Sequence, residues 1–321
     1  MALDFPDSPV DGEIFGIFTF DSASGAWRVQ NAPTPLINVH AVCVAGGGSP
    51  CASGSWMAGG AGAGGFIDQS LSLASGSYTV EVGAGGAAAG ATYSTGNDGN
   101  DSVFASLTAN GGGRGGTANN PGGVGNTGGS AGGSGYNQSS ETASDGTGQG
   151  CNGGRGYNGN GLTGGGGGAS EGGNDRDGSW YGVGGHGMPT RIISTTTATS
   201  ESVGEVATYG PIGVDQVWFA GGGGGTISTS SSARAGGLGG GGTGSRNGSV
   251  PENGTANTGG GGGGPWTYQA YVTGGSGIVI IRLSTNVNVT VSAGLTYATD
   301  TSETGSIAYI FKSGTGTVTL G

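Results

Sequence analysis

The sequence predicts a mainly β protein with no significant α-helix. Glycine contributes 83 of the 321 residues, and 75 of these glycines lie between residues 46 and 277. Runs of β-branched and aromatic residues lead repeatedly into glycine runs in that region, and each glycine costs about 1 kcal/mol in a helix. We therefore expect three parts: a β-hairpin module at 1–35, a glycine-rich bundle of β-strands and polyglycine II helices at 36–283, and a small antiparallel β meander at 284–321.

The N-terminal module is expected from two aromatic-rich runs, residues 13–20 and 26–30, which flank turn residues at 21–25. This arrangement is typical of a β-hairpin. Trp27 should cover one face of the hairpin together with Phe18 or Phe20.

The middle region alternates strand-like runs with glycine runs. The strand-like runs are residues 37–44, 78–82, 102–109, 214–220 and 277–283, and glycine runs follow the first four. Glycine has no side chain to bury, so the entropy lost on ordering it must be offset by backbone hydrogen bonds. Helices with three residues per turn and no internal hydrogen bonds can pack laterally and bond to one another. The alternative is a flexible linker, which would not place a strand before each glycine run.

The C-terminal region resumes ordinary strand patterns. Val287, Val289 and Val291 alternate with polar residues, and further strand-like runs occupy 295–299, 306–312 and 315–320. Turn residues at 292–294 and 303–305 separate them. The sequence therefore predicts an antiparallel meander.

Composition excludes several classes of function. The chain carries only nine Lys and Arg residues and a net charge of −11, so nucleic acid is not an expected partner. The single lysine lies near the C-terminus, which excludes a phosphate-binding loop. Two isolated histidines supply no catalytic set, and we expect neither an enzyme nor a cofactor. The N-terminus has no signal-peptide pattern, and no apolar run is long enough to span a membrane.

Two acidic turns are weak candidates for a cation site. Asp98 and Asp101 lie in one turn, and Asp175 and Asp177 lie in another. Both turns are rich in oxygen ligands, but neither follows a known calcium loop pattern, and Asx turns explain both equally well. We therefore expect no bound metal. The three cysteines are an odd number and do not indicate a disulfide framework.

Aromatic residues between the glycine runs are the best candidates for recognition. A bundle built from glycine has little room for rings, so they must pack over its edge or be displayed at its ends, and Trp and Tyr are enriched at binding hot spots. The candidates for display are Trp180, Tyr181, His186, Trp266, Tyr268 and Tyr271.

The succession of residues 42–48, 77–86, 109–113 and 274–282 resembles the glycine-rich domain of bacteriophage tail-fibre and adhesin-like virion proteins. The head resembles an N-terminal module of marine phage structural proteins, and residues 311–318 are similar to the C-terminal β-end of such proteins. In tip adhesins of this kind, glycine-rich helices form a layered bundle whose loops bind the bacterial surface.

The resemblance implies a non-enzymatic tail fibre or receptor-binding adhesin. Its partners would be other virion proteins and a bacterial surface glycan or outer-membrane protein, and a homotrimer is a candidate assembly. Such a protein would be made in the host cytoplasm without a signal peptide and would act outside the cell, on the virion. The alternatives are a virion component without a receptor role (a head fibre, decoration or tail-assembly protein) and, more distantly, an ice-binding polyglycine-helix protein.

Overall fold

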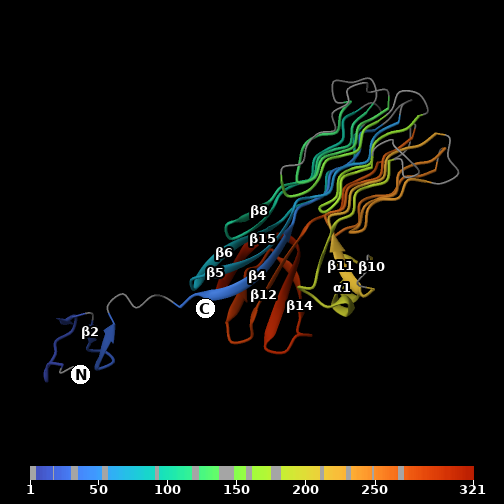
Figure 1. Cartoon of the computed structure of the whole chain (residues 1–321). Helices are drawn as coiled ribbons and strands as arrows, with labels where there is room; N and C mark the ends of the chain where they lie inside the picture. Colours follow the sequence, from blue (N-terminus) through green and yellow to red (C-terminus); the bar gives the residue numbers. More distant parts are fainter. Residues whose placement is uncertain are drawn as a thin grey trace. The chain divides into compact units, whose positions relative to one another are not determined.

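The computed structural model confirms a nearly all-β chain (Figure 1). It describes residues 5–16, 18–29, 35–52, 57–90, 94–117, 123–136, 148–156, 161–174, 182–209, 213–228, 233–247, 249–266 and 271–321. Within these residues the single α-helix has seven residues. The chain forms two compact units, Met1–Leu36 and Ile37–Gly321.

The first unit is a three-stranded antiparallel sheet. Its strands are β1 (Ile14–Phe15), β2 (Phe18–Asp21) and β3 (Ala26–Val29), in that order. Phe20 lies opposite Trp27, with ring centroids 5.5 Å apart, which confirms the predicted partner of Trp27. Phe5 stacks on Trp27 at 5.1 Å, so one aromatic cluster holds this unit together.

A nine-stranded antiparallel sheet forms the base of the second unit. In order, its main strands are β5 (Phe66–Leu73), β4 (Ile37–Val44), β12 (Ile278–Ser284), β15 (Ser306–Leu320), β6 (Gly76–Val82), β7 (Ser102–Phe104) and β8 (Leu107–Ala109). Strands β13 (Val289–Val291) and β14 (Thr296–Asp300) also pair with β15.

The long strand β15 joins the two halves of this sheet. It pairs with β12 up to Phe311 and with β6 from Gly314 onward. Gly314 has a φ of 101°, which glycine adopts readily and other residues rarely do. The change of partner allows β6, β7 and β8 to pack over one face of β4 and β12.

Strand β12 is buried on both faces. Val279, Ile281 and Leu283 face the core beneath β6 and β7, whereas Ile278 and Ile280 face a second core. A strand covered on both sides needs no polar alternation. Burial on both faces thus explains the unbroken apolar run at 278–281.

The second core lies under a small sheet and a helix, of which the sequence predicted only the strand at 214–220. Strands β9 (Met188–Thr190), β10 (Glu205–Thr208) and β11 (Asp215–Phe219) form a small sheet in the order β10-β11-β9. The helix α1 (Thr195–Glu201) contacts β10 and β11. Together they cover the outer face of β4, β12 and β15.

Glycine-rich helices extend from this base as a laterally bonded bundle (Figure 1). The N–H groups of residues 58–65 donate in turn to three neighbouring segments, so that every third N–H group donates to the same segment. The N···O distances are 2.8–3.2 Å. The three sets of donors reach residues 259–265, 110–116 and 164–167. A period of three is that of the expected polyglycine II helix.

The carbonyl groups of the same helix are bonded to other segments. They accept from residues 130–133, 45–48 and Gly223, so residues 58–65 are surrounded by six neighbours. Residues 45–49 repeat the arrangement. They donate to 62–65, 97–100 and Gly275, and they accept from 112–115, Gly86 and Gly262. The predicted bundle of side-by-side polyglycine helices is therefore present.

The C-terminal strands are part of the larger unit in the structure. The sequence pattern separates residues 284–321 from the glycine-rich region, but β15 pairs with both β12 and β6, and β14 lies at the edge beside it. The reason is that one 15-residue strand runs through the positions expected for two strands of the meander.

Candidate functional site

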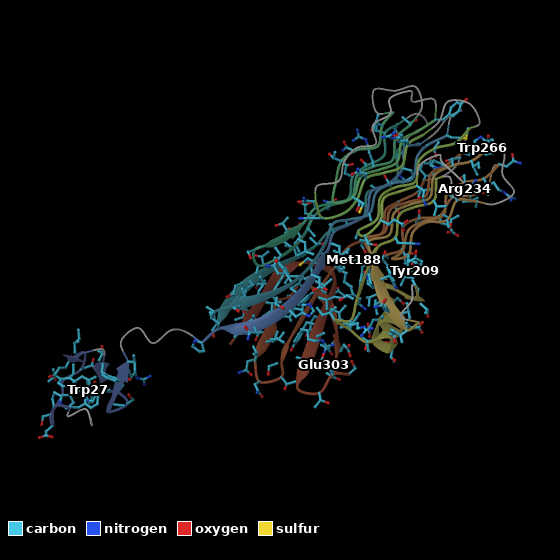
Figure 2. All side chains as sticks on the ribbon, viewed as in Figure 1. Trp27, Met188, Tyr209, Arg234, Trp266 and Glu303 are labelled. Carbon is cyan, nitrogen blue, oxygen red and sulfur yellow. The ribbon has the colours of Figure 1, made fainter. Side chains whose placement is uncertain are left out.

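The end of the bundle away from the sheet carries one of the aromatic residues expected to bind a partner, and a second follows it along the chain. Trp266 is half-buried and lies at that end, far from Glu303 on the base (Figure 2). The carbonyl of Pro265, next to Trp266, accepts a hydrogen bond from the N–H of Ala58, which fixes the helix end. Tyr271, five residues further along, is 78% exposed and is the most exposed large apolar or aromatic side chain among the described residues.

His186 lies elsewhere, in an aromatic cluster at the junction of the bundle and the small sheet. Its ring centroid is 4.6 Å from that of Tyr209, and Tyr209 is 5.6 Å from Trp218 in an edge-to-face arrangement. The N–H of Leu238 donates to Nδ1 of His186 at 3.0 Å. This bond fixes the ring, and its Nε2 lies 3.9 Å from the carboxylate of Glu171.

The structure does not bring His186 together with Trp266. Tyr209, which touches His186, lies beside Met188 near β11, whereas Trp266 lies at the far end (Figure 2). The reason is chain direction: residues 182–187 lead into β9 at the base, so His186 comes at the lower end of its helix. Trp180, Tyr181 and Tyr268 lie outside the described residues.

Sequence reasoning missed Tyr209 and Met188 as surface residues beside His186. Tyr209 is 49% exposed and Met188 is 36% exposed. Tyr209 follows β10 directly, and a glycine and a proline come next, which is a pattern typical of a strand end. That pattern could have indicated an aromatic residue at the edge of a sheet, but it does not reveal that β9 and β10 flank β11.

The acidic residues considered for a cation site have structural partners. Asp98 accepts from the backbone N–H of Arg114 and from the side-chain amide of Asn126, and Asp101 accepts from the N–H of Gly111. Both carboxylates therefore bond to backbone N–H groups of the bundle. Within the described ranges no three His, Cys, Asp or Glu residues lie close enough to hold a metal. Asp175 and Asp177 fall outside those ranges.

A buried ion pair joins the base to the segment before α1. Arg282 Nη2 lies 3.0 Å from Asp300 Oδ2, and Arg282 Nε donates to the carbonyl of Ile192 at 2.7 Å. Burial alone would raise the pKa of Asp300, but hydrogen bonds from the N–H groups of Ser194 and Ser302 outweigh it and lower that pKa. Every polar group here has a structural partner, so the pair stabilises the fold.

The cysteines carry no redox pair. Cys43, Cys51 and Cys151 are all free thiols. Burial raises the pKa of Cys43 to about 12, so its thiol stays protonated and unreactive. In the part of the chain that the structure describes, no helix has the length and apolar character needed to cross a bilayer.

Comparison with known proteins identifies the family. A model of the glycine-rich domain family matches residues 22–284. The chain therefore belongs to the glycine-rich domain family, and the match covers the bundle together with β12. No curated protein and no solved structure matches the chain.

Proposed function

We propose that this protein is a bacteriophage virion structural protein, a tail fibre or receptor-binding adhesin that contacts the bacterial surface through segments displayed on its glycine-rich scaffold. The observation that carries the proposal is the six-neighbour packing of residues 45–49 and 58–65. A bundle whose interior is backbone provides a stiff support. Recognition is then left to the residues at its surface and ends.

The far end of the bundle is the best-supported contact surface. Trp266 lies there (Figure 2), and the exposed Tyr271 follows it five residues further along the chain. Aromatic side chains on rigid supports provide large contact areas with little loss of conformational entropy. Rings also stack on the faces of sugars, which suits a surface glycan as the receptor.

Contact rather than catalysis is the proposed mode of action. Individual contacts would be weak, and several copies on one particle would multiply them. The proposed partners are other virion proteins on one side and a bacterial surface glycan or outer-membrane protein on the other. The proposed location is the virion.

The test is adsorption of phage particles that carry Tyr271→Ala and Trp266→Ala. We expect each substitution to slow adsorption to the host, at a cost of roughly 1–2 kcal/mol per contact if the residue is a hot spot. The matched control is Tyr297→Ala, because Tyr297 is a 45% exposed tyrosine on the base. The unfolding temperature of each purified variant reports whether folding is intact.

The outcomes separate the proposed role from its alternative. Slower adsorption with the two bundle variants and normal adsorption with the control supports a receptor-binding adhesin. Normal adsorption with the double variant contradicts it. Failure of the variants to enter particles, with folding intact, favours a virion component without a receptor role.

A further inference from the structure

We propose that a pocket at the junction of the bundle and the sheet binds one neutral sugar residue, with Lys312 as its central hydrogen-bond donor. The pocket has a volume of about 490 Å³, which is within the range of small-molecule sites. It is lined by Val82, Gly83, Ala84, Asn257, Ser276, Lys312, Ser313 and Gly314. This pocket is separate from the far end of the bundle and does not depend on the proposed function.

Lys312 is the only lysine in the chain. Its Nζ donates to Oε2 of Glu201 at 2.9 Å, and Glu201 ends α1. An ammonium group has three N–H donors, so this bond engages one of them and orients the side chain.

A residue with a strained backbone lines another part of the pocket. Asn257 has a φ of 60°, a left-handed conformation that costs free energy for a residue other than glycine. Its N–H donates to Oγ of Ser276 at 2.9 Å, and its side-chain amide donates to the carbonyl of Ser202 at 3.2 Å. Asn257 is therefore fixed at the pocket before any ligand arrives, as preorganised binding requires.

The lining suits a ring with hydroxyl groups. Lys312, Asn257, Ser276 and Ser313 bring ammonium, amide and hydroxyl groups, whereas Val82 and Ala84 bring aliphatic surface. A sugar residue has the matching pattern, because its hydroxyl groups both donate and accept and its C–H groups form an apolar face. The ion pair with Glu201 balances the charge of Lys312, which favours a neutral sugar over an anion.

The single lysine gives a direct test by nuclear magnetic resonance. Protein labelled with ¹³C-lysine gives one ε-methylene signal, which reports on the pocket. We would titrate the full chain separately with glucose, galactose, mannose and N-acetylglucosamine, and with sodium acetate at matched ionic strength. We expect a saturable shift with at least one neutral sugar and none with acetate.

Two variants test the pocket itself. Ser313→Tyr fills the pocket and should abolish the saturable shift, whereas Ser70→Tyr, at an exposed serine of β5 outside the pocket, should leave it unchanged. Asn257→Gly keeps the positive φ accessible and removes the amide, so binding should weaken roughly 3- to 10-fold. Unfolding temperatures identify any variant that fails to fold.

Three results would overturn the inference. The first is no shift with any of the four sugars. The second is an equal shift with acetate, which would indicate simple anion pairing with Lys312. The third is unchanged sugar affinity in both Ser313→Tyr and Asn257→Gly, which would place the ligand elsewhere.

Discussion

Most bundle glycines lie where any side chain would overlap the backbone of another helix. A Cβ atom on Gly166 would collide with the carbonyl of Ala61, and one on Gly262 would come within 2.8 Å of the carbonyl oxygen of Thr273. Real Cβ atoms do not approach a backbone so closely. Glycine is therefore required at these positions by close approach.

Replacing Gly166 or Gly262 with Val should destabilise the protein by at least about 1–3 kcal/mol, because the helices would have to separate. Thermal unfolding measures the effect. The control is Gly76→Val at the start of β6, where the nearest atom to an added Cβ is the hydroxyl of Tyr78, 4.0 Å away. Equal unfolding temperatures for the bundle variants and wild type would contradict the close packing of backbones in the bundle.

Asp300 should make the fold sensitive to acid. Its folded pKa lies below the unfolded value, so its ionised form contributes stability above about pH 4, and this contribution is lost as pH falls through the folded pKa. We expect Asp300→Asn to lower the free energy of unfolding at pH 7. The difference from wild type should shrink toward pH 2 in urea titrations at several pH values. A constant difference across that range would rule out this role.

Individual side-chain contacts could be predicted only within a hairpin. A contact of Trp27 with Phe18 or Phe20 followed from the turn at 21–25, because a short turn constrains the register of its two strands, and the structure selects Phe20. The partner of His186 did not follow. Tyr209 is 23 residues away and reaches His186 through β9, α1 and β10, and residue spacing contains no information on that path.

The helix α1 depends on its cap more than on its composition. Residues 195–201 are mostly threonine and serine, which are poor helix formers. Ser194 compensates by accepting a hydrogen bond from the N–H of Thr197 at 3.1 Å, as a typical N-cap residue does.

Ser194→Ala should therefore lower the free energy of unfolding by about 1 kcal/mol. The matched control is Ser200→Ala, at an exposed position inside α1, where alanine has the better helix propensity and no loss is expected. Denaturant titration measures both. Equal effects of the two substitutions would show that the cap contributes nothing.

Strands that precede glycine runs were predictable, whereas strands β5, β9 and β10 were missed. Strand β4 has the predicted bounds because an apolar run ends sharply at a glycine run. Strand β5 has exposed polar residues along its middle, since it lies at the edge of the sheet, and it follows a glycine run. The helix α1 was missed because its cap is a single serine in a threonine-rich segment.

Burial within the bundle should set the order of amide hydrogen exchange across the larger unit. Residues 58–65 have neighbours on all six sides, whereas Ala84, Ala87 and Gly90 face solvent at every third position of an outer helix. We expect the amides of 58–65 to exchange among the slowest of the bundle, and those of 84–90 markedly faster. Hydrogen exchange measured by mass spectrometry checks this prediction. Equal exchange rates for the two segments would contradict a bundle whose central helix is packed on all sides.

The chain forms two compact units, of which the smaller has its own aromatic cluster and the larger begins with β4. The association of β15 with both β12 and β6 was not predictable, because each partner lies in a different part of the chain. Pairing between strands that are so far apart in the sequence depends on the assembled core.

The six-neighbour packing has a mechanical consequence. In a β-sheet, a strand at the edge can peel away by breaking its bonds to one partner, one after another. A helix at the centre of this bundle bonds to six segments in turn along its length, so a pulling force must shear bonds in all directions at once. We expect the bundle to resist tension along its axis more strongly than an edge strand of the base, such as β5.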